Sequence, residues 1–187
     1  MRRKTEKGVR KRVFIMIGAV LAMLLTAGYW NINQRIPQAV VEDVNIGGTL
    51  EFQDGVMISV DSYRFLSDKE QQLYEEVGFN TIHESKLLEV NLTLENMTAE
   101  SKQIIMSDMY VEGIGISNGI PKMITDASEG HYSGNLQELQ PGEKKQVCYP
   151  YEILHNQVSQ KEWGDITERE FWLTFSSYPV KKKLLLS

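Results

Sequence analysis

Apolar and polar residues alternate along several short stretches of this chain, most clearly over residues 88–95. Leucine or valine occupies each even position of this stretch, and the odd positions are Glu89, Asn91, Thr93 and Glu95. Successive side chains of a β-strand point to opposite faces of the sheet. The pattern therefore predicts a strand whose apolar residues are buried and whose four polar residues are exposed.

Shorter stretches of the same kind predict further strands at 49–52, 56–61, 104–111, 146–153 and 171–175, the last of which is expected to close the core. Turns containing Gly55 and Gly142 separate consecutive strands, because glycine accepts the positive φ that tight turns need. Apolar residues at helical spacing predict a short helix or turn at 67–78, and residues 158–167 are expected to form a short helical or irregular crossing. About seven strands with one or two short helices predict an all-β fold, an antiparallel immunoglobulin-like β-sandwich.

Residues 13–30 follow a different pattern, an apolar run with no charge and no proline. At about 1.5 Å per residue, a helix of this length spans roughly 27 Å, close to the hydrocarbon thickness of a bilayer. Tyr29 and Trp30 end the run, and such aromatic rings favour the headgroup region. The run predicts a single N-terminal transmembrane helix with Tyr29 and Trp30 at the membrane interface.

The alternative for this run is a signal peptide that is cleaved after export. The best cleavage tripeptide ends at Ala27, but it begins with the bulky Leu25 where a small residue is preferred. Gly28 stands where a lipoprotein would need its lipid-acceptor cysteine. An uncleaved anchor is therefore favoured. It divides the chain into a cytoplasmic basic tail at 1–12, the helix at 13–30, a spacer at 31–46 and an extracellular domain at 47–187.

Charge is distributed unevenly around the apolar run. Residues 1–12 hold seven lysines and arginines and one glutamate, so the tail carries +6, whereas the whole chain carries −5. Basic residues beside a membrane helix remain in the cytoplasm, which predicts a single-pass protein of the cell membrane with its C-terminal domain outside. The acidic domain would repel phosphates, so nucleic acid is not expected as a partner.

Candidate chemistry in the domain is sparse. Cys148 is the only cysteine, so no intramolecular disulfide can form, and Cys148 is expected to be a half-buried strand residue. The histidines His83, His131 and His155 are far apart in the sequence and match no metal-binding motif. Neither a serine-nucleophile motif nor a phosphate loop is found. The sequence predicts no catalytic residue, no cofactor and no metal site, and hence a protein that is not an enzyme.

Several segments together carry a resemblance to a known family. They are the strand at 88–94 with its end at 95–98, the turn at 139–143 that leads into 147–150, and residues 161–163 followed by 171–175 and 177–179. In these segments the domain resembles the immunoglobulin-like (telokin-like) extracellular domains of unknown function found on membrane-anchored surface proteins and lipoproteins of Gram-positive bacteria. The resemblance implies a fold and a place at the cell surface, and it supplies no catalytic residues.

Together these features predict a non-enzymatic module that binds another protein or a component of the cell envelope. One alternative is an accessory subunit of a membrane complex such as a transporter, for which Gly18, Ala19 and Ala22 provide a weak stripe of small residues on the helix. A further alternative is an enzyme whose site is assembled from residues distant in the sequence.

The segment 112–136 is the candidate partner-binding region. It is too long for an ordinary hairpin loop, and loops on rigid sandwiches often carry recognition. Its candidate partner-binding residues are apolar: Ile114, Ile116, Ile120, Met123 and Tyr132. The alternative is that the apolar residues of this segment form strand pieces and simply join the core.

Overall fold

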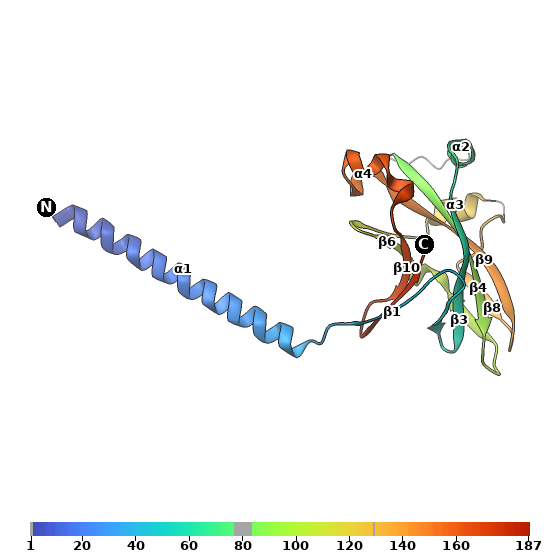
Figure 1. The fold of residues 1–187 in the computed structure, drawn as a ribbon, viewed down its shortest axis with the longest axis horizontal. Coiled ribbons are helices and arrows are strands. Elements are labelled where there is room, and N and C mark those ends of the chain that lie inside the picture. The colour runs from blue at the N-terminus through green and yellow to red at the C-terminus, as the bar shows by residue number, and fades with distance from the viewer. Residues whose placement is uncertain (1, 77–83, 129) are drawn as a thin grey trace. The chain divides into compact units, whose positions relative to one another are not determined.

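A computed structural model describes residues 2–76, 84–128 and 130–187 of the chain. The chain divides into two compact units, Met1–Ala39 and Val40–Ser187. Figure 1 shows the first as one helix and the second as a domain made mostly of strands.

The first unit consists of helix α1, Arg2–Arg35. Its segment Phe14–Arg35 is long and apolar enough to cross a membrane, with a mean hydropathy of 1.7. The helix runs beyond the predicted end at Trp30. Pro37 explains where it stops, because proline disfavours helical geometry in the residue before it.

The second unit contains eleven strands within the described residues, more than the seven or so that the sequence indicates. They are β1 Val40–Val44, β2 Thr49–Gln53, β3 Val56–Phe65, β4 Ser85–Asn96, β5 Lys102–Ile105, β6 Tyr110–Gly113, β7 Ile116–Gly119, β8 Leu136–Leu139, β9 Lys144–Leu154, β10 Trp172–Ser176 and β11 Val180–Leu185. Three short α-helices and three 3-10 turns join them: α2 Asp68–Glu76, α3 Lys122–Ala127, α4 Gln160–Gly164, η1 Met106–Asp108, η2 His155–Gln157 and η3 Ile166–Glu168.

The strands form a β-sandwich, as the sequence predicted. One sheet has the order β1-β11-β10-β6-β7, a second has the order β2-β3-β4-β9, and β5 pairs with β8 in a small third sheet. Aromatic pairs join the two larger sheets: the ring of Phe52 meets that of Phe175 edge-on at 5.0 Å, and Phe65 meets Phe171 at 5.8 Å. A single large hydrophobic core therefore draws residues from all three sheets.

Strand β4 confirms the predicted alternation on its core face. Leu88, Val90, Leu92 and Leu94 are all fully buried in the main core. On the outer face, Asn91, Thr93 and Glu95 are partly exposed, but Glu89 is only 5% exposed. The prediction that Glu89 is exposed is wrong, because other elements cover this end of the outer face.

Two predicted elements end differently in the structure. The strand expected at 104–111 is broken by η1 into β5 and β6, which belong to different sheets. The strand at 171–175 is not the last, since β11 follows it and pairs with β10. Strands β5 and β6 separate because β5 pairs with β8 whereas β6 pairs with β7 and β10, and β11 pairs both with its neighbour β10 and with the distant β1. Local alternation does not report these partners.

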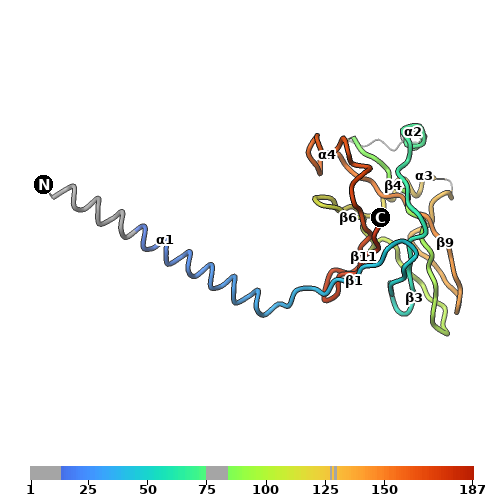
Figure 2. The backbone as a smooth tube through the Cα atoms, in the orientation of Figure 1, coloured from blue at the N-terminus to red at the C-terminus, as the bar shows by residue number. Residues whose placement is uncertain are grey.

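The expected spacer at 31–46 is shorter than predicted, because the compact unit begins at Val40. Strand β1 pairs in parallel with β11 at the far end of the chain, as the tubes side by side in Figure 2 show. This pairing sets Glu42 opposite Lys182 and Asp43 opposite Lys183. Opposite charges on neighbouring strands attract each other, and this attraction helps to explain why β1 forms a strand beside β11.

The predicted turns are confirmed, and so is the first short helix as far as Glu76; residues 77 and 78 of that prediction lie outside the described residues. Gly55, in the turn between β2 and β3, has a φ of +81°, and a Cβ there would lie 2.6 Å from Cγ2 of Thr98. Only glycine fits this turn without strain. Helix α2 begins after Ser67, whose hydroxyl accepts from the Glu70 backbone N–H while the Glu70 carboxylate accepts from Ser67. This reciprocal capping box explains why a helix starts here.

Candidate functional site

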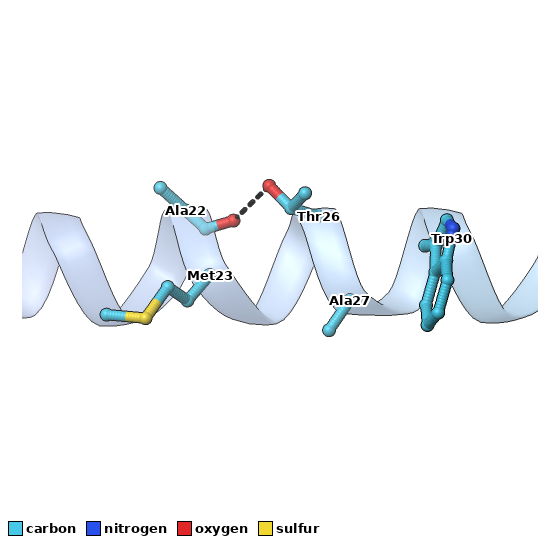
Figure 3. A pocket seen from close by; sticks show the side chains of 5 residues that line it. All are labelled: Ala22, Met23, Thr26, Ala27 and Trp30. Atoms are coloured by element: carbon cyan, nitrogen blue, oxygen red, sulfur yellow. Dashed lines mark hydrogen bonds between the residues drawn. The ribbon is translucent and has the colours of Figure 1, made fainter.

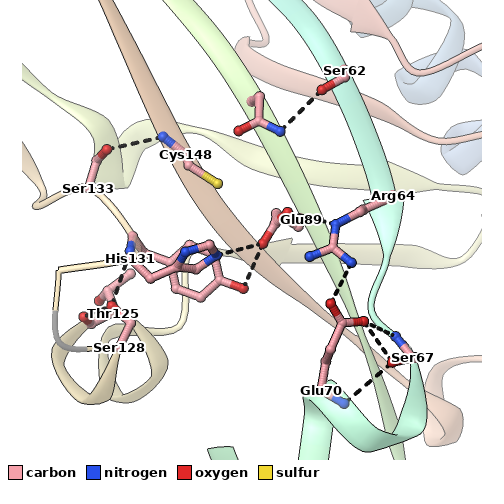
Figure 4. A network of polar contacts seen from close by, with 12 residues as sticks. Ser62, Arg64, Ser67, Glu70, Glu89, Thr125, Ser128, His131, Ser133 and Cys148 are labelled. Carbon is pink, nitrogen blue, oxygen red and sulfur yellow. Dashed lines mark hydrogen bonds and ion pairs between the residues drawn. The ribbon is translucent and has the colours of Figure 1, made fainter.

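A cluster of charged and polar side chains surrounds Glu89 on the outer face of β4 (Figure 4). Its Oε1 accepts a hydrogen bond from Nε of Arg64 at 2.8 Å. Its Oε2 lies 2.9 Å from Nε2 of His131 and 3.3 Å from the hydroxyl of Tyr132. Both carboxylate oxygens of Glu89 are therefore occupied, which makes the burial of this charge tolerable.

Helix α2 holds Arg64 in place from one side. A second guanidinium nitrogen of Arg64 donates to Glu70 at 2.7 Å, so that Arg64 lies between two carboxylates. Hydrogen bonds from the Ser67 hydroxyl and backbone, followed by that from Arg64, hold the pKa of Glu70 at about 2. Gln71 fastens the same helix to β4, because its amide donates to the carbonyl of Ser85 and accepts from the N–H of Leu87.

The segment after α3 supplies His131 and Tyr132. The hydroxyl of Ser128 donates to the carbonyl of Thr125 and accepts from the backbone N–H of Tyr132, which fixes the turn. Tyr132 is buried in a second, smaller hydrophobic core with Leu66, Leu87 and Ile124. This second core lies on the Glu89 side of β4, because Leu87 and Glu89 point to the same face. Apolar packing on this face thus closes over the carboxylate.

The electrostatics of Glu89 result from two opposing effects. Burial alone would raise the pKa of its carboxyl, but the hydrogen bonds from His131 and Arg64 outweigh burial, so the pKa lies below its ordinary value. Glu89 is consequently ionised at neutral pH. Burial, as the largest cause, raises the pKa of the neighbouring Tyr132 hydroxyl, which stays protonated.

Cys148 completes the cluster from the adjacent strand. It lies on β9 opposite Asn91 of β4 and is half-buried, as the sequence predicted. Burial, together with the nearby charge of Glu89, raises the pKa of its thiol to about 12. Ligand atoms of Cys148, Glu89 and His131 all lie within 4.8 Å of one another. A thiol with a raised pKa is a poor nucleophile, so this geometry favours a structural or ligand-binding role over covalent catalysis.

A cavity of about 320 Å³ lies beside α3. Polar side chains on its wall include those of Lys122 and Asp126, which form an ion pair with each other. The hydroxyl of Tyr149, which also lines the cavity, donates to the carbonyl of Gly134 at 2.7 Å. The cavity is large enough for a small molecule, but its charged and hydroxyl groups are largely paired within the protein.

The structure separates the five residues of the predicted partner-binding region. Ile116 and Tyr132 are buried, at 3% and 4% exposure, in two different cores, and Ile120 packs against the main core. Ile114, in the turn between β6 and β7, is 80% exposed, and Met123 on α3 is 63% exposed. Most of the described part of segment 112–136 forms strands and a helix that contribute to the cores, as the alternative expected, and partner binding by Ile114 and Met123 stays a prediction.

The other histidines lie apart from the cluster or outside the described residues. His155 lies 3.1 Å from a carboxylate oxygen of Glu84 and stacks on the indole of Trp163 at 4.8 Å. His83 falls in the segment that the structure does not describe. Of the two histidines within the described residues, His131 is the one that the structure brings beside Cys148 and Glu89.

Helix α1 presents the residues expected at the membrane. Tyr29 and Trp30 are exposed near its C-terminal end. Figure 3 shows a shallow hollow on α1 lined by Ala22, Met23, Thr26, Ala27 and Trp30. The hydroxyl of Thr26 donates to the carbonyl of Ala22 at 2.8 Å, so it is satisfied within the helix. A threonine paired in this way is compatible with an apolar environment.

Comparison with known proteins gives a family. The family profile described as "Domain of unknown function (DUF5028)" matches residues 37–182, which is most of the chain. No functionally curated protein matches.

Several solved structures are similar to this chain at low sequence identity. An uncharacterised β-sandwich protein from Clostridium difficile 630 is 10% identical over 81% of this chain and 97% of its own, with a TM-score of 0.44. The yjhA protein from Bacillus subtilis is 13% identical over 76% of this chain and 98% of its own, with a TM-score of 0.45. A functionally unknown protein from Listeria monocytogenes EGD-e is 11% identical over 74% of this chain and 79% of its own, with a TM-score of 0.44. The assignment of a β-sandwich rests on the sheets of this chain.

Proposed function

Since the chain belongs to the DUF5028 family, whose description assigns no activity, we propose a function from its own architecture: a non-enzymatic binding module that α1 anchors in a bacterial cell membrane with the β-sandwich outside. The observation that carries the proposal is that the chain contains both an apolar helix of membrane length and a separate β-sandwich with its own core. A domain with its own core needs no membrane to fold, so the helix is free to serve as an anchor.

The charge of the chain supports this orientation. The tail before the apolar segment carries +6, and the remainder of the chain is acidic. A positive tail is retained on the cytoplasmic side. The resemblance to immunoglobulin-like surface domains of Gram-positive bacteria supports the same placement.

The chemistry of the Glu89 cluster supports a role in binding. Glu89 is held ionised by Arg64 and His131, and the thiol of Cys148 has a raised pKa. General acid–base or nucleophilic catalysis needs a group poised near the working pH, which neither residue provides. The proposed partner is a protein or a component of the cell envelope. Of the candidate partner-binding residues, Ile114 and Met123 are exposed and could contact this partner directly.

A second candidate function is that of an accessory subunit in a membrane complex such as a transporter. The hollow on α1 favours it, because Ala22, Thr26 and Ala27 would let another helix approach closely. In that case the partner binds the helix in the membrane as well as the domain.

Single-cysteine labelling in intact Gram-positive cells tests the anchored topology. In a Cys148→Ser background, a Met97→Cys variant places a thiol on an exposed residue beyond β4, and a Thr5→Cys variant places one in the tail. A membrane-impermeant maleimide should label the Met97→Cys protein in intact cells and the Thr5→Cys protein only after permeabilisation. Labelling in the opposite order would overturn the topology, and membrane protein that lacks residue 5 would show that the helix is cleaved.

A further inference from the structure

We propose that Glu89, His131 and Cys148 bind one divalent transition-metal ion of the zinc type on the outer face of the β2-β3-β4-β9 sheet. Each of the three offers a ligand atom, and these atoms lie within 4.8 Å of one another. They come from three separate segments: β4, the turn after α3, and β9. The inference goes beyond the proposed binding module, which does not require a metal.

The spacing of the ligand atoms is close to that of a tetrahedral site. Zinc binds imidazole nitrogen and carboxylate oxygen at about 2.1 Å and sulfur at about 2.3 Å, which sets neighbouring ligand atoms about 3.5 Å apart. The carboxylate oxygen of Glu89 and Nε2 of His131 are 2.9 Å apart. To bind an ion, this pair must open by about half an ångström and the sulfur must approach by no more than about 1.2 Å. The His131 side chain is more than half exposed, so it has room to move.

The donor set selects the kind of ion. A thiolate, an imidazole and a carboxylate suit zinc and its neighbours, whereas calcium and magnesium prefer oxygen ligands throughout. Two negative ligands balance the charge of a divalent ion: the carboxylate of Glu89 and the thiolate of Cys148, whose proton passes to solvent on binding. His131 binds as a neutral imidazole, and the proton of its hydrogen bond to Glu89 also leaves Nε2 or moves to the other ring nitrogen.

Arg64 acts as a positioning residue for this site. It bonds to Oε1 of Glu89, while His131 and Tyr132 approach Oε2. Holding one oxygen leaves the other directed at the ion, which is the usual arrangement of a metal-ligating carboxylate. Ser133 holds the backbone of Cys148 through a hydrogen bond from the Cys148 N–H at 3.0 Å. Three protein ligands leave a fourth coordination position for water or another ligand.

The presence of an imidazole and a thiol beside one carboxylate distinguishes the cluster from an ordinary ion pair. Arg64 shares its charge between Glu70 and Glu89, and His131 completes the pairing of Glu89, but Cys148 is not needed for that purpose. The structure nevertheless places an imidazole and a thiol at the same carboxylate. Cys148 is also the only cysteine of the chain, so a disulfide does not account for its position.

Metal titration of the full chain in detergent, after removal of metal, tests the proposal. Zn²⁺ should bind with one equivalent per chain by calorimetry, and Co²⁺ should give the near-ultraviolet charge-transfer band of a cobalt thiolate. The Cys148→Ser variant should lose that band, and the Cys148→Ser and His131→Gln variants should each bind Zn²⁺ at least about 100-fold more weakly. The matched control is a His83→Gln, His155→Gln double variant, which should bind as the wild type does.

A second readout needs no variant and so does not depend on whether a variant folds. Zn²⁺ should protect Cys148 of the wild-type chain from alkylation by N-ethylmaleimide, and chelation should restore the reaction. Absence of Zn²⁺ binding to the wild type would overturn the proposal. Binding that survives loss of Cys148 and His131, or that leaves alkylation unchanged, would overturn it equally and show that the cluster is an ion-pair network alone.

Discussion

The two faces of β4 are both buried near Glu89, but they are buried by different means. On the core face, Leu88 and Val90 pack against apolar residues of the opposite sheet. On the outer face, Glu89 is enclosed by Arg64, His131 and Tyr132, which reach it from β3 and the turn after α3. The core face requires only apolar volume, whereas the outer face requires particular partners at hydrogen-bond distance. Alternation in the sequence predicts the face to which each side chain points, but it does not predict which other elements bury that face.

The largest expected effect is on the core face. Replacing Leu92 by alanine should lower the free energy of unfolding by about 2–5 kcal/mol, because the change removes buried methyl groups and leaves a cavity. Urea unfolding of the chain, followed by tryptophan fluorescence, measures the effect. A loss no greater than that of an exposed residue would contradict the burial of this face.

An intermediate effect is expected at Glu89. Replacing it by alanine should cost about 1–3 kcal/mol, because Arg64, His131 and Tyr132 lose a charged hydrogen-bond acceptor. The cost should stay below that of Leu92→Ala, since Arg64 and His131 are about half exposed and can turn to water. The same urea experiment, carried out with chelator present, checks this order. An unchanged free energy of unfolding in the Glu89→Ala variant would mean that the cluster does not contribute to the stability of the fold.

The smallest effect is expected further along the same outer face, at Thr93. Its hydroxyl donates to a carboxylate oxygen of Asp61 at 2.8 Å, but both groups meet water. Replacing Thr93 by alanine should change the free energy of unfolding by less than about 0.5 kcal/mol. A cost equal to that of Glu89→Ala would remove the distinction between the covered and open parts of this face.

Much of the sandwich could be predicted because its determinants are local. The even positions of 88–95, the glycine turn after β2 and the short helix that begins near residue 67 each depend on residues close together in the sequence, and each is confirmed. Strand β1 could not be predicted in the same way. Its partner β11 lies at the opposite end of the chain, so no local pattern reports the pairing.

The candidate site was hidden for the same reason. Glu89 finds Arg64 at a separation of 25 residues and His131 at a separation of 42. The sequence analysis interpreted His131 and Cys148 as isolated residues, because neither has another metal-ligating residue at the spacing of a known metal-binding motif. A weak signal was present, because one of the two interpretations of segment 112–136 had its apolar residues join the core. Tyr132 does so, and it brings His131 to Glu89.

A pair of double-mutant cycles tests most directly the claim that the covered end of the outer face is a built site. One cycle combines Glu89→Ala with Arg64→Ala, and the other combines Asp61→Ala with Thr93→Ala, with unfolding free energies measured in metal-free buffer. The account predicts a coupling of about 1–2 kcal/mol for Glu89 and Arg64 and less than about 0.5 kcal/mol for Asp61 and Thr93. Equal couplings in the two cycles would contradict it, because the enclosure of Glu89 would then add nothing beyond an ordinary surface contact.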